Sequence, residues 1–429
     1  MEISKSKDFN PNYLAKVVEI KNLRPHSNAD RLQVAIVDFQ EVIIDISTKI
    51  GDICVFFPLE CQINADFLQE TNSYASQLLN KDTNIKGYFD KNGRVRATKL
   101  RGEKSQGYLV PVKTIEEFFN CELLDKVSQE FDTIGNVLIC KKYKLPVKGM
   151  NTNDKVGKKP KISRLIDGQV RLHIDTEQLE RNAHKVNLDD DITITYKLHG
   201  TSGWVSHVLV KKELNLIEKI LKKFGVRIID TEYDFIYGSR KVVKNSNMRK
   251  TNNNFYDCNV WLLIKEELKE FVPKNYTIYY EALGFTPSGS AIQKNYDYGC
   301  KQGEKKVFVY RITVTNPCGM VIDLSSLQVK EFCDRAGLNY VPLLYRGRAR
   351  DLVSNPDAEN WREEFISELR KRWTEKDCYI CQNKVPEEGI VLRKEGLFGF
   401  EAYKLKSFRF LQHETEMLDN GEVDIESVN

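Results

Sequence analysis

The chain has 429 residues, of which 41% are hydrophobic and 29% are charged, and its formal net charge is +4. This length accommodates two or three domains that each bury a core, and the composition excludes a disordered or fibrous protein. Because the net charge is small, a polyanionic partner such as nucleic acid would have to bind local basic surfaces.

Targeting and redox signals are weak. The first residues, MEISKSKDFNPNYL, lack the apolar run of a signal peptide, and no stretch is long enough to cross a bilayer. The ten cysteines show no repeated spacing, which suits reduced thiols. The close pair Cys378 and Cys381 lacks the further ligands of a zinc site. We expect a monomer in the cytoplasm or another intracellular compartment, with no membrane partner.

Short apolar segments separated by polar turns fill residues 1–140. They are YLAKVVEI, LQVAIVDF, EVIIDIS, DICVFFPL, RVRATKL and GYLVPV. This density of strands predicts a small closed β-barrel, and we favour an oligonucleotide-binding (OB) barrel.

One strand of this barrel and its turn, RVRATKLRGEKSQG, is strongly basic. The cations are Arg94, Arg96, Lys99, Arg101 and Lys104. Such a row suits phosphate contacts, with Lys99 and Arg101 as the candidate nucleic-acid-binding residues. A solvated edge strand kept soluble by its charges explains the pattern equally well.

Residues 141–161, KKYKLPVKGMNTNDKVGKKPK, contain eight lysines and one acid, which predicts a basic linker. From residue 162 to 410, apolar strands alternate with amphipathic helical segments such as ELNLIEKILKKFG and AENWREEFISELRKRW, so a mixed α/β domain follows. Residues 411–429 are interpreted as an acidic tail that is disordered or lightly packed.

Lys197 ends the apolar segment DITITY and begins the string KLHGTS. A lysine at the end of a buried strand, followed by a glycine turn, is held where its amine can be desolvated and aimed at a ligand. The neutral amine that desolvation favours is the form that attacks phosphorus. A KxxG tetrapeptide is common by chance, however, so this element alone leaves a structural role open.

Downstream of Lys197, five short elements carry side chains that suit the binding of a nucleotide or a phosphate. They are Ser239 and Arg240 in YGSRK, Glu281 in IYYEALGF, Phe308 and Tyr310 in VFVYRI, Glu388 and Ile390 in EGIV, and Lys404 and Lys406 in YKLKS. Each has an ordinary structural explanation as a core aromatic, a solvated acid or a solvent-facing lysine stripe. Their combination favours a functional site.

With KLHGTS, this ordered set resembles the covalent nucleotidyltransferase superfamily of polynucleotide ligases and mRNA capping enzymes, over about residues 170–410. The KxHGxS form is similar to RNA ligases in particular. The barrel with its KLRG and SQG turn also resembles the OB domain of RNA ligases that seal 3′-OH and 5′-phosphate ends. The resemblance implies an α+β chain, in which an OB-type barrel precedes a mixed α/β nucleotidyltransferase (ATP-grasp-like ligase) domain.

The resemblance implies three catalytic lysines. Lys197 would attack the α-phosphorus of ATP and carry AMP as a lysyl phosphoramidate, which then passes to the 5′-phosphate of an RNA end. Lys404 and Lys406, alternating along a strand, would neutralise charge at the α-phosphate. Glu388 would bind Mg²⁺ or Mn²⁺, because hard cations prefer carboxylate oxygen.

It also implies the groups that hold the nucleotide and the RNA. Glu281 would hold the ribose hydroxyls, Phe308 or Tyr310 would stack on adenine, and Ile390 would pack on its other face. The remaining candidates contact the nucleotide (His199 and Gly200 in KLHGTS, and Arg181 in HIDTEQLERN) or the 5′-phosphate of the RNA (Ser239 and Arg240).

Two positions depart from the superfamily pattern. His199 stands where many members have Asp, which affects the expected metal shell, and Arg311 stands where relatives often have an acid. The partner implied is a pair of RNA ends in a nicked duplex or a broken structured RNA, with a role in RNA repair.

Other functions are compatible with parts of the sequence. A catalytically inactive RNA-binding protein would retain the fold, and a capping-type nucleotidyltransferase would use GTP. The segment RPHSNADRLQVAIV resembles tRNA-binding modules, which would explain the first 140 residues only.

Overall fold

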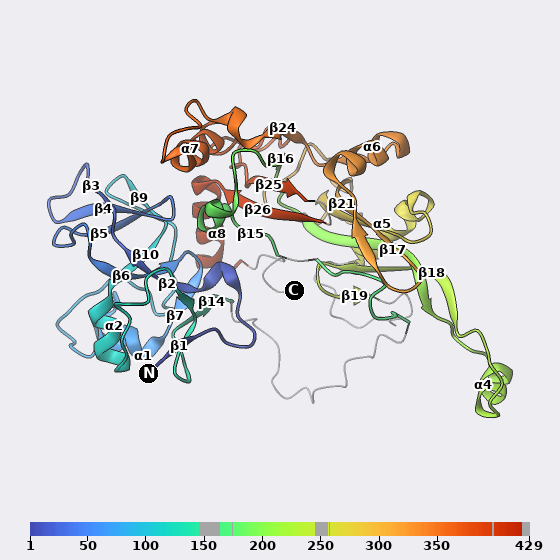
Figure 1. The fold of residues 1–429 in the computed structure, drawn as a ribbon, viewed down its shortest axis with the longest axis horizontal. Coiled ribbons are helices and arrows are strands. Elements are labelled where there is room, and N and C mark those ends of the chain that lie inside the picture. Colours follow the sequence, from blue (N-terminus) through green and yellow to red (C-terminus); the bar gives the residue numbers. More distant parts are fainter. Residues whose placement is uncertain (146–163, 174, 245–255, 257, 397–398, 423–429) are drawn as a thin grey trace.

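The computed structural model describes residues 1–145, 164–173, 175–244, 256, 258–396 and 399–422. Two domains lie side by side in Figure 1, the first in blue and teal and the second in green to red. Most of the predicted linker, from residue 146 to its end at 161, lies outside the described residues.

The first domain is a barrel of short strands, as predicted. Its strands are β1 (Ile3–Ser4), β2 (Ala15–Glu19), β3 (Asn22–Pro25), β4 (Leu32–Val37), β5 (Gln40–Asp45), β6 (Ile53–Pro58), β7 (Cys61–Ile63), β8 (Thr98–Leu100), β9 (Glu103–Ser105), β10 (Gly107–Pro111), β11 (Glu130–Phe131), β12 (Thr133–Ile134), β13 (Val137–Leu138) and β14 (Cys140–Lys142). Its helices are α1 (Ala65–Glu70) and α2 (Val112–Phe119). The main sheets have the orders β10-β6-β2-β11 and β3-β4-β5.

Strand β6 lies between β10 and β2 in the larger sheet, and both of its faces are buried. Val55 and Phe57 point into one hydrophobic cluster, whereas Cys54 and Phe56 point into a second one. Alternation along a strand explains the division, and it accounts for the continuous apolar run ICVFF in the sequence.

The second domain contains two sheets, with the orders β15-β26-β25-β16-β24 and β19-β18-β17-β20-β21-β22, and β23 pairs with β21. The strands are β15 (Glu177–Gln178), β16 (Asp191–Tyr196), β17 (Thr201–Lys211), β18 (Thr231–Ser239), β19 (Val243–Lys244), β20 (Tyr276–Gly284), β21 (Lys305–Thr315), β22 (Val321–Asp323), β23 (Asn339–Tyr340), β24 (Leu343–Arg348), β25 (Gly389–Glu395) and β26 (Phe400–Lys406). The helices are α3 (Leu179–Asn182), α4 (Leu216–Lys223), α5 (Val260–Leu268), α6 (Ser326–Ala336), α7 (Trp361–Trp373) and α8 (Phe408–Asp419).

The interpretation of residues 411–429 as a loosely packed tail was wrong for its first part. Helix α8 begins directly after β26, with Ser407 as its N-cap, and its Phe408 is buried in the core of the barrel. The helix therefore lies between the two domains (Figure 1). Residues 423–429 lie outside the described residues.

Arg94 lies in the contact between α8 and the barrel. Its assignment to a phosphate-contacting surface was therefore wrong. Its side chain is 1% exposed, it pairs with Glu60 and Asp419, and it donates to the carbonyl of Thr415. A buried guanidinium with three acceptors fixes α8 to the barrel and cannot reach a nucleic acid.

A second contact between the domains is made by Asn12, which is 3% exposed. Its amide donates to the carbonyl of Thr176 at 3.2 Å and accepts from the backbone N–H of Gln178 at 3.0 Å.

Among the described residues, no helix combines the length and apolar character that crossing a membrane requires.

Replacing Arg94 by alanine should lower the free energy of unfolding by about 3 kcal/mol, because it leaves buried carboxylate without its partner. Arg96→Ala is the control, since its ion pairs of 3.8 and 3.6 Å are partly exposed, and it should cost less than about 1 kcal/mol. Chemical denaturation should be followed by circular dichroism, which reports on both domains. Tryptophan fluorescence would report on the second domain only, because all four tryptophans lie there. Equal losses for the two variants would contradict this role of Arg94.

Candidate nucleotidyl-transfer site

Lys197 lies directly after β16, at the junction of two cavities. Its backbone N–H donates to the carbonyl of Gly389 at 2.9 Å, which fixes it beside the start of β25. Its ammonium lies 2.6 Å from Oε1 of Glu388, whose side chain is 1% exposed. The predicted lysine and the predicted metal-binding acid are therefore in direct contact.

The glycine turn after Lys197 packs closely against β20. A Cβ atom on Gly200 would lie 2.3 Å from the carbonyl oxygen of Ala282, so no larger residue fits. The backbone N–H of His199 donates to the hydroxyl of Tyr298 at 2.7 Å. His199 is buried, and its Nδ1 lies 3.9 Å from Oε2 of Glu388, so it occupies the surroundings of that carboxylate.

The first cavity has a volume of about 620 Å³ and is lined by strands of both sheets. Lys197 lies at one end, with Glu281 and Tyr310 among the lining residues. Glu281 is a buried residue of β20 whose register partner on β17 is Ser202. The hydroxyls of Ser202 and Tyr310 are hydrogen bonded at 2.8 Å, which fixes the orientation of the Tyr310 ring.

Phe308 and Tyr310 do not share this cavity, although alternation along β21 predicts that they do. The pairing of β20 with β21 shifts between Tyr279 and Tyr280, so that Tyr310 is an extra residue in the strand. Such a bulge reverses the alternation beyond it. Arg311 therefore lines the same cavity as Tyr310. Phe308 and Tyr310 both pack against the cluster around Leu198, but Phe308 does not line the cavity.

The assignment of Ile390 to the wall of this cavity is also corrected. Ile390 is fully buried in the cluster formed by β16, β25, β26 and α7. Val391, the next residue, points to the opposite face and lines the cavity with Arg393. Successive residues of a strand point to opposite faces, so Val391 lines the cavity together with Tyr310 and Ile390 does not.

The far end of the cavity is lined by charged and aromatic side chains that the sequence analysis did not assign to it. The guanidinium of Arg311 lies 4.6 Å from the centre of the Tyr279 ring and 5.6 Å from that of Phe400, and its Nε is 2.5 Å from Asp323. The guanidinium of Arg393 lies 3.9 Å from the centre of the Phe400 ring. These cations are held by fixed partners and present a rigid wall.

Glu388 carries the features of a ligand for a hard cation. Within the described part of the chain, its buried Oε2 accepts no hydrogen bond. Burial, with Cys378 and Glu388 nearby, raises the pKa of the adjacent Glu387 to about 9, so at neutral pH Glu387 is protonated. The described residues contain no cluster of three or more His, Cys, Asp or Glu that could hold a metal. A cation bound here would need oxygen ligands from a substrate or from water.

Lys404 and Lys406 both line the second cavity, on the same face of β26. The ammonium of Lys406 lies 2.8 Å from Glu414 of α8 and 3.8 Å from Glu388. Burial would raise the pKa of Glu414, but the Lys406 ammonium lowers it below its usual value, so this pair is charged.

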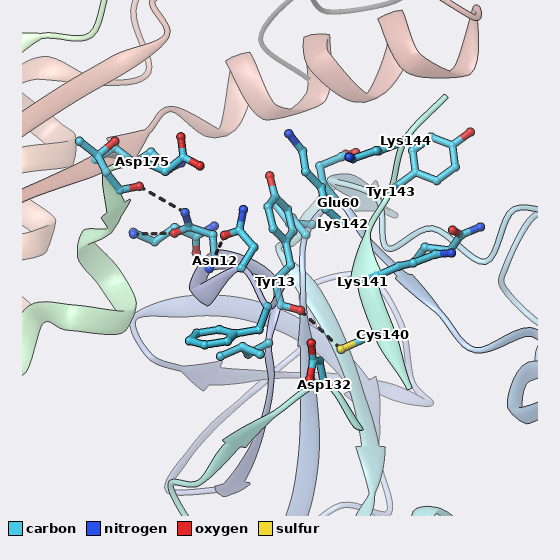
Figure 2. A pocket seen from close by; sticks show the side chains of 18 of the residues that line it. Asn12, Tyr13, Glu60, Asp132, Cys140, Lys141, Lys142, Tyr143, Lys144 and Asp175 are labelled. Carbon is cyan, nitrogen blue, oxygen red and sulfur yellow. Dashed lines mark hydrogen bonds between the residues drawn. The ribbon is translucent and has the colours of Figure 1, made fainter. Parts of the chain in front are cut away.

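The second cavity, of about 710 Å³, lies between the barrel and the second domain. Figure 2 shows Asn12, Tyr13, Lys141 and Lys142 of the barrel on one side and Asp175 on the other. The ammonium of Lys142 lies 5.7 Å from the centre of the Tyr13 ring. The wall thus combines lysines with an aromatic face.

Arg240 lines both cavities, and its Nη2 lies 2.6 Å from Asp175. Despite burial, the Arg240 and Lys241 cations hold the pKa of Asp175 below its usual value. Its neighbour Ser239 is 1% exposed, lines neither cavity and accepts a hydrogen bond from Trp204 through its carbonyl. Of the predicted pair, only Arg240 is placed to meet a ligand.

Arg181 is placed elsewhere than the resemblance implied. It is buried, donates to the carbonyl of Leu14 at 3.0 Å and lies 2.6 Å from Glu130, so it joins α3 to the barrel. Lys99 is exposed on β8, and Arg101 is exposed in the turn to β9. These two cations line neither cavity.

A model of the RNA ligase family matches residues 190–408, half of the chain, and this chain therefore belongs to the RNA ligase family. A model of an OB-fold domain matches residues 14–112, which confirms the OB-type barrel. No match was found among curated protein sequences.

Solved structures of an RNA ligase from Naegleria gruberi are similar over nearly the whole chain. One variant without ligand has a TM-score of 0.59 and 16% identity, covering 95% of this chain and 100% of that chain. Variants described with AMP and Mn and with ATP and Mn each have a TM-score of 0.57 and 16% identity, covering 93% of this chain and 98% of theirs. The predicted order of an OB barrel followed by a mixed α/β ligase domain is thus confirmed.

Proposed function

We propose that this chain is an ATP-dependent RNA ligase that joins 3′-OH and 5′-phosphate ends in RNA repair, with Lys197 as the carrier of AMP. The observation that carries the proposal is the position of Lys197, in contact with Glu388 at the junction of the two cavities. The similar ligases with bound AMP or ATP and Mn support the choice of nucleotide and metal.

The first cavity suits the AMP moiety. Tyr310 would stack on one face of adenine and Val391 would pack on the other, while Glu281 would accept hydrogen bonds from the ribose hydroxyls. Lys197 then lies at the phosphate end. Its nitrogen would bond to the α-phosphorus as the bond to pyrophosphate breaks, and the amine would lose its proton.

The ion pair with Glu388 bears on this step. A carboxylate 2.6 Å away stabilises the ammonium form of lysine, whereas attack requires the neutral amine. Magnesium or manganese on Glu388 would neutralise the carboxylate and weaken its hold on Lys197. Lys404 and Lys406 would neutralise charge on the phosphate, and such a contact contributes about 3 kcal/mol to transition-state stabilisation.

The second cavity suits the nucleic acid. Arg240 would bind the RNA 5′-phosphate, which attacks the lysyl-AMP and becomes capped with AMP. The 3′-hydroxyl of the other end would then displace AMP and complete the phosphodiester. Positioning by the two domains carries most of this chemistry, because phosphoryl transfer needs aligned groups and charge neutralisation.

Incubation with Mg²⁺ and ATP radiolabelled at the α-phosphate should yield a protein adduct that survives denaturing electrophoresis. Lys197→Ala should abolish it, whereas Lys219→Ala, on the distant helix α4, should not. The label should pass to 5′-phosphorylated RNA. An adduct that forms with GTP instead would favour capping chemistry, and the absence of any adduct would exclude the enzyme.

Two neighbouring residues test the adenine site. Val391→Ala should raise the KM for ATP several-fold with little change in stability, because Val391 lines the cavity. Ile390→Ala should instead lower the free energy of unfolding by about 2–5 kcal/mol, since it empties part of a packed core. Adduct formation against ATP concentration, together with denaturation curves, measures both; the reverse pattern would restore Ile390 to the adenine wall.

Lys142→Ala tests the course of the RNA. Because Lys142 lies on the barrel wall of the second cavity, its loss should slow the sealing of nicked RNA more than self-adenylylation, and should lower the salt slope of RNA binding by about one. Arg101→Ala is the comparison on the exposed β8–β9 turn. A larger loss in Arg101→Ala would mean that RNA follows the basic hairpin, as the sequence analysis predicted.

A further inference from the structure

The strands β17 and β18 form a long hairpin that carries α4 at its far end, well away from the catalytic cavities (Figure 1). None of the residues of α4 is buried. The adjoining segment continues the exposure, because Phe224 is 80% and Ile229 79% exposed. A globular protein rarely leaves so many neighbouring large apolar side chains in water without a partner.

The apolar side chains of α4 form one face. They are Leu216, Ile217, Ile220, Leu221 and the C-cap residue Phe224, all exposed. Since successive residues of a helix turn by roughly 100°, this spacing puts them on a single side. The helix is also built to stand alone, because Asn215 and Glu218 form a complete capping box.

The opposite side is basic. Residues 211–230 contain six cationic and three acidic side chains. Two of the acids are already paired, Glu218 with Lys212 and Asp230 with Lys222. In the described part of the chain, no ion pair engages Lys219, Lys223 or Arg227. Lys219 and Lys223 lie on α4 outside the apolar arc, and Arg227 follows in the exposed segment after the helix.

We propose that α4 and the segment up to Ile229 bind the surface of an anionic lipid bilayer, with the apolar face inserted and the lysines at the headgroups. A helix with this division of charge lies in a membrane interface, where buried apolar area and attraction to anionic lipid add together. Long lysine side chains at the edge of the face reach the headgroups while their stems stay apolar.

The shape of the tip favours a planar surface over another copy of the chain. The helix has two turns, which is too short for a stable helix pair. It also stands at the end of a projecting hairpin, so a flat bilayer can reach it without contacting the domains (Figure 1). Such binding needs no spanning helix, and it would differ from the expectation of no membrane partner.

Flotation of the full chain with vesicles tests the proposal. The protein should float with phosphatidylcholine vesicles that contain phosphatidylserine, and much less with phosphatidylcholine alone. Ile220→Glu combined with Phe224→Glu should lower the bound fraction roughly tenfold, because partitioning follows buried apolar area. Lys219→Glu combined with Lys223→Glu should remove the preference for anionic lipid.

Leu78→Glu is the control, since Leu78 is an exposed leucine of the barrel, at 85%, and this variant should float as the wild type does. Retained covalent labelling by ATP would show that the α4 variants are folded. Wild-type protein that stays unbound to anionic vesicles would overturn the proposal. So would an equal loss in Leu78→Glu, or a dimer in solution that Phe224→Glu separates.

Discussion

Lys406 is held between two carboxylates, and this contact joins the strand that carries the lysine to the helix that is fixed to the barrel. One carboxylate is Glu388, directly before the neighbouring strand β25, and the other is Glu414, on α8. Because α8 begins two residues after Lys406 and buries Phe408 in the barrel, the strand that supplies the lysine also supplies the attachment of the OB domain. A shift of the barrel relative to the second domain would therefore move Glu414 and change the charge beside Lys406. Domain position and phosphate binding are linked through one side chain.

Much of this could be predicted from the sequence because the informative signals are local. The strand before Lys197, the glycine that must approach Ala282 closely, and the order of the later elements depend on residues near one another in the chain. Burial periodicity predicts strands, and a strand that ends in a lysine and a tight turn predicts where the lysine is held. The barrel was predictable for the same reason, since its strands are short, apolar and separated by polar turns.

The failures have a different origin, because they depend on partners distant in sequence or on backbone irregularities. Arg94 and Arg181 are of the residue type that binds phosphate, but acceptors distant in the chain hold both side chains in buried positions between the domains. The bulge at Tyr310 lets Arg311 line the same cavity as Tyr310, and the residue types do not reveal such a bulge. Ile390 and Val391 are both apolar and β-branched, so the sequence does not show which of them faces the cavity. Only the core on one side of β25 distinguishes the two residues.

Three described cations of the site are balanced by acids of the chain itself. Lys197 is paired with Glu388, Lys406 with Glu414, and Arg240 with Asp175. A phosphate that enters must replace these carboxylates, so its binding exchanges one ion pair for another. The net cost of such an exchange is modest, since a buried pair gains little beyond its desolvation penalty. Because the displaced groups belong to the protein and are not salt ions, these three contacts release few counterions. The salt dependence of RNA binding therefore reports mainly on the lysines of the barrel wall, and the chemistry at Lys197 is shielded from the ionic strength that governs RNA capture.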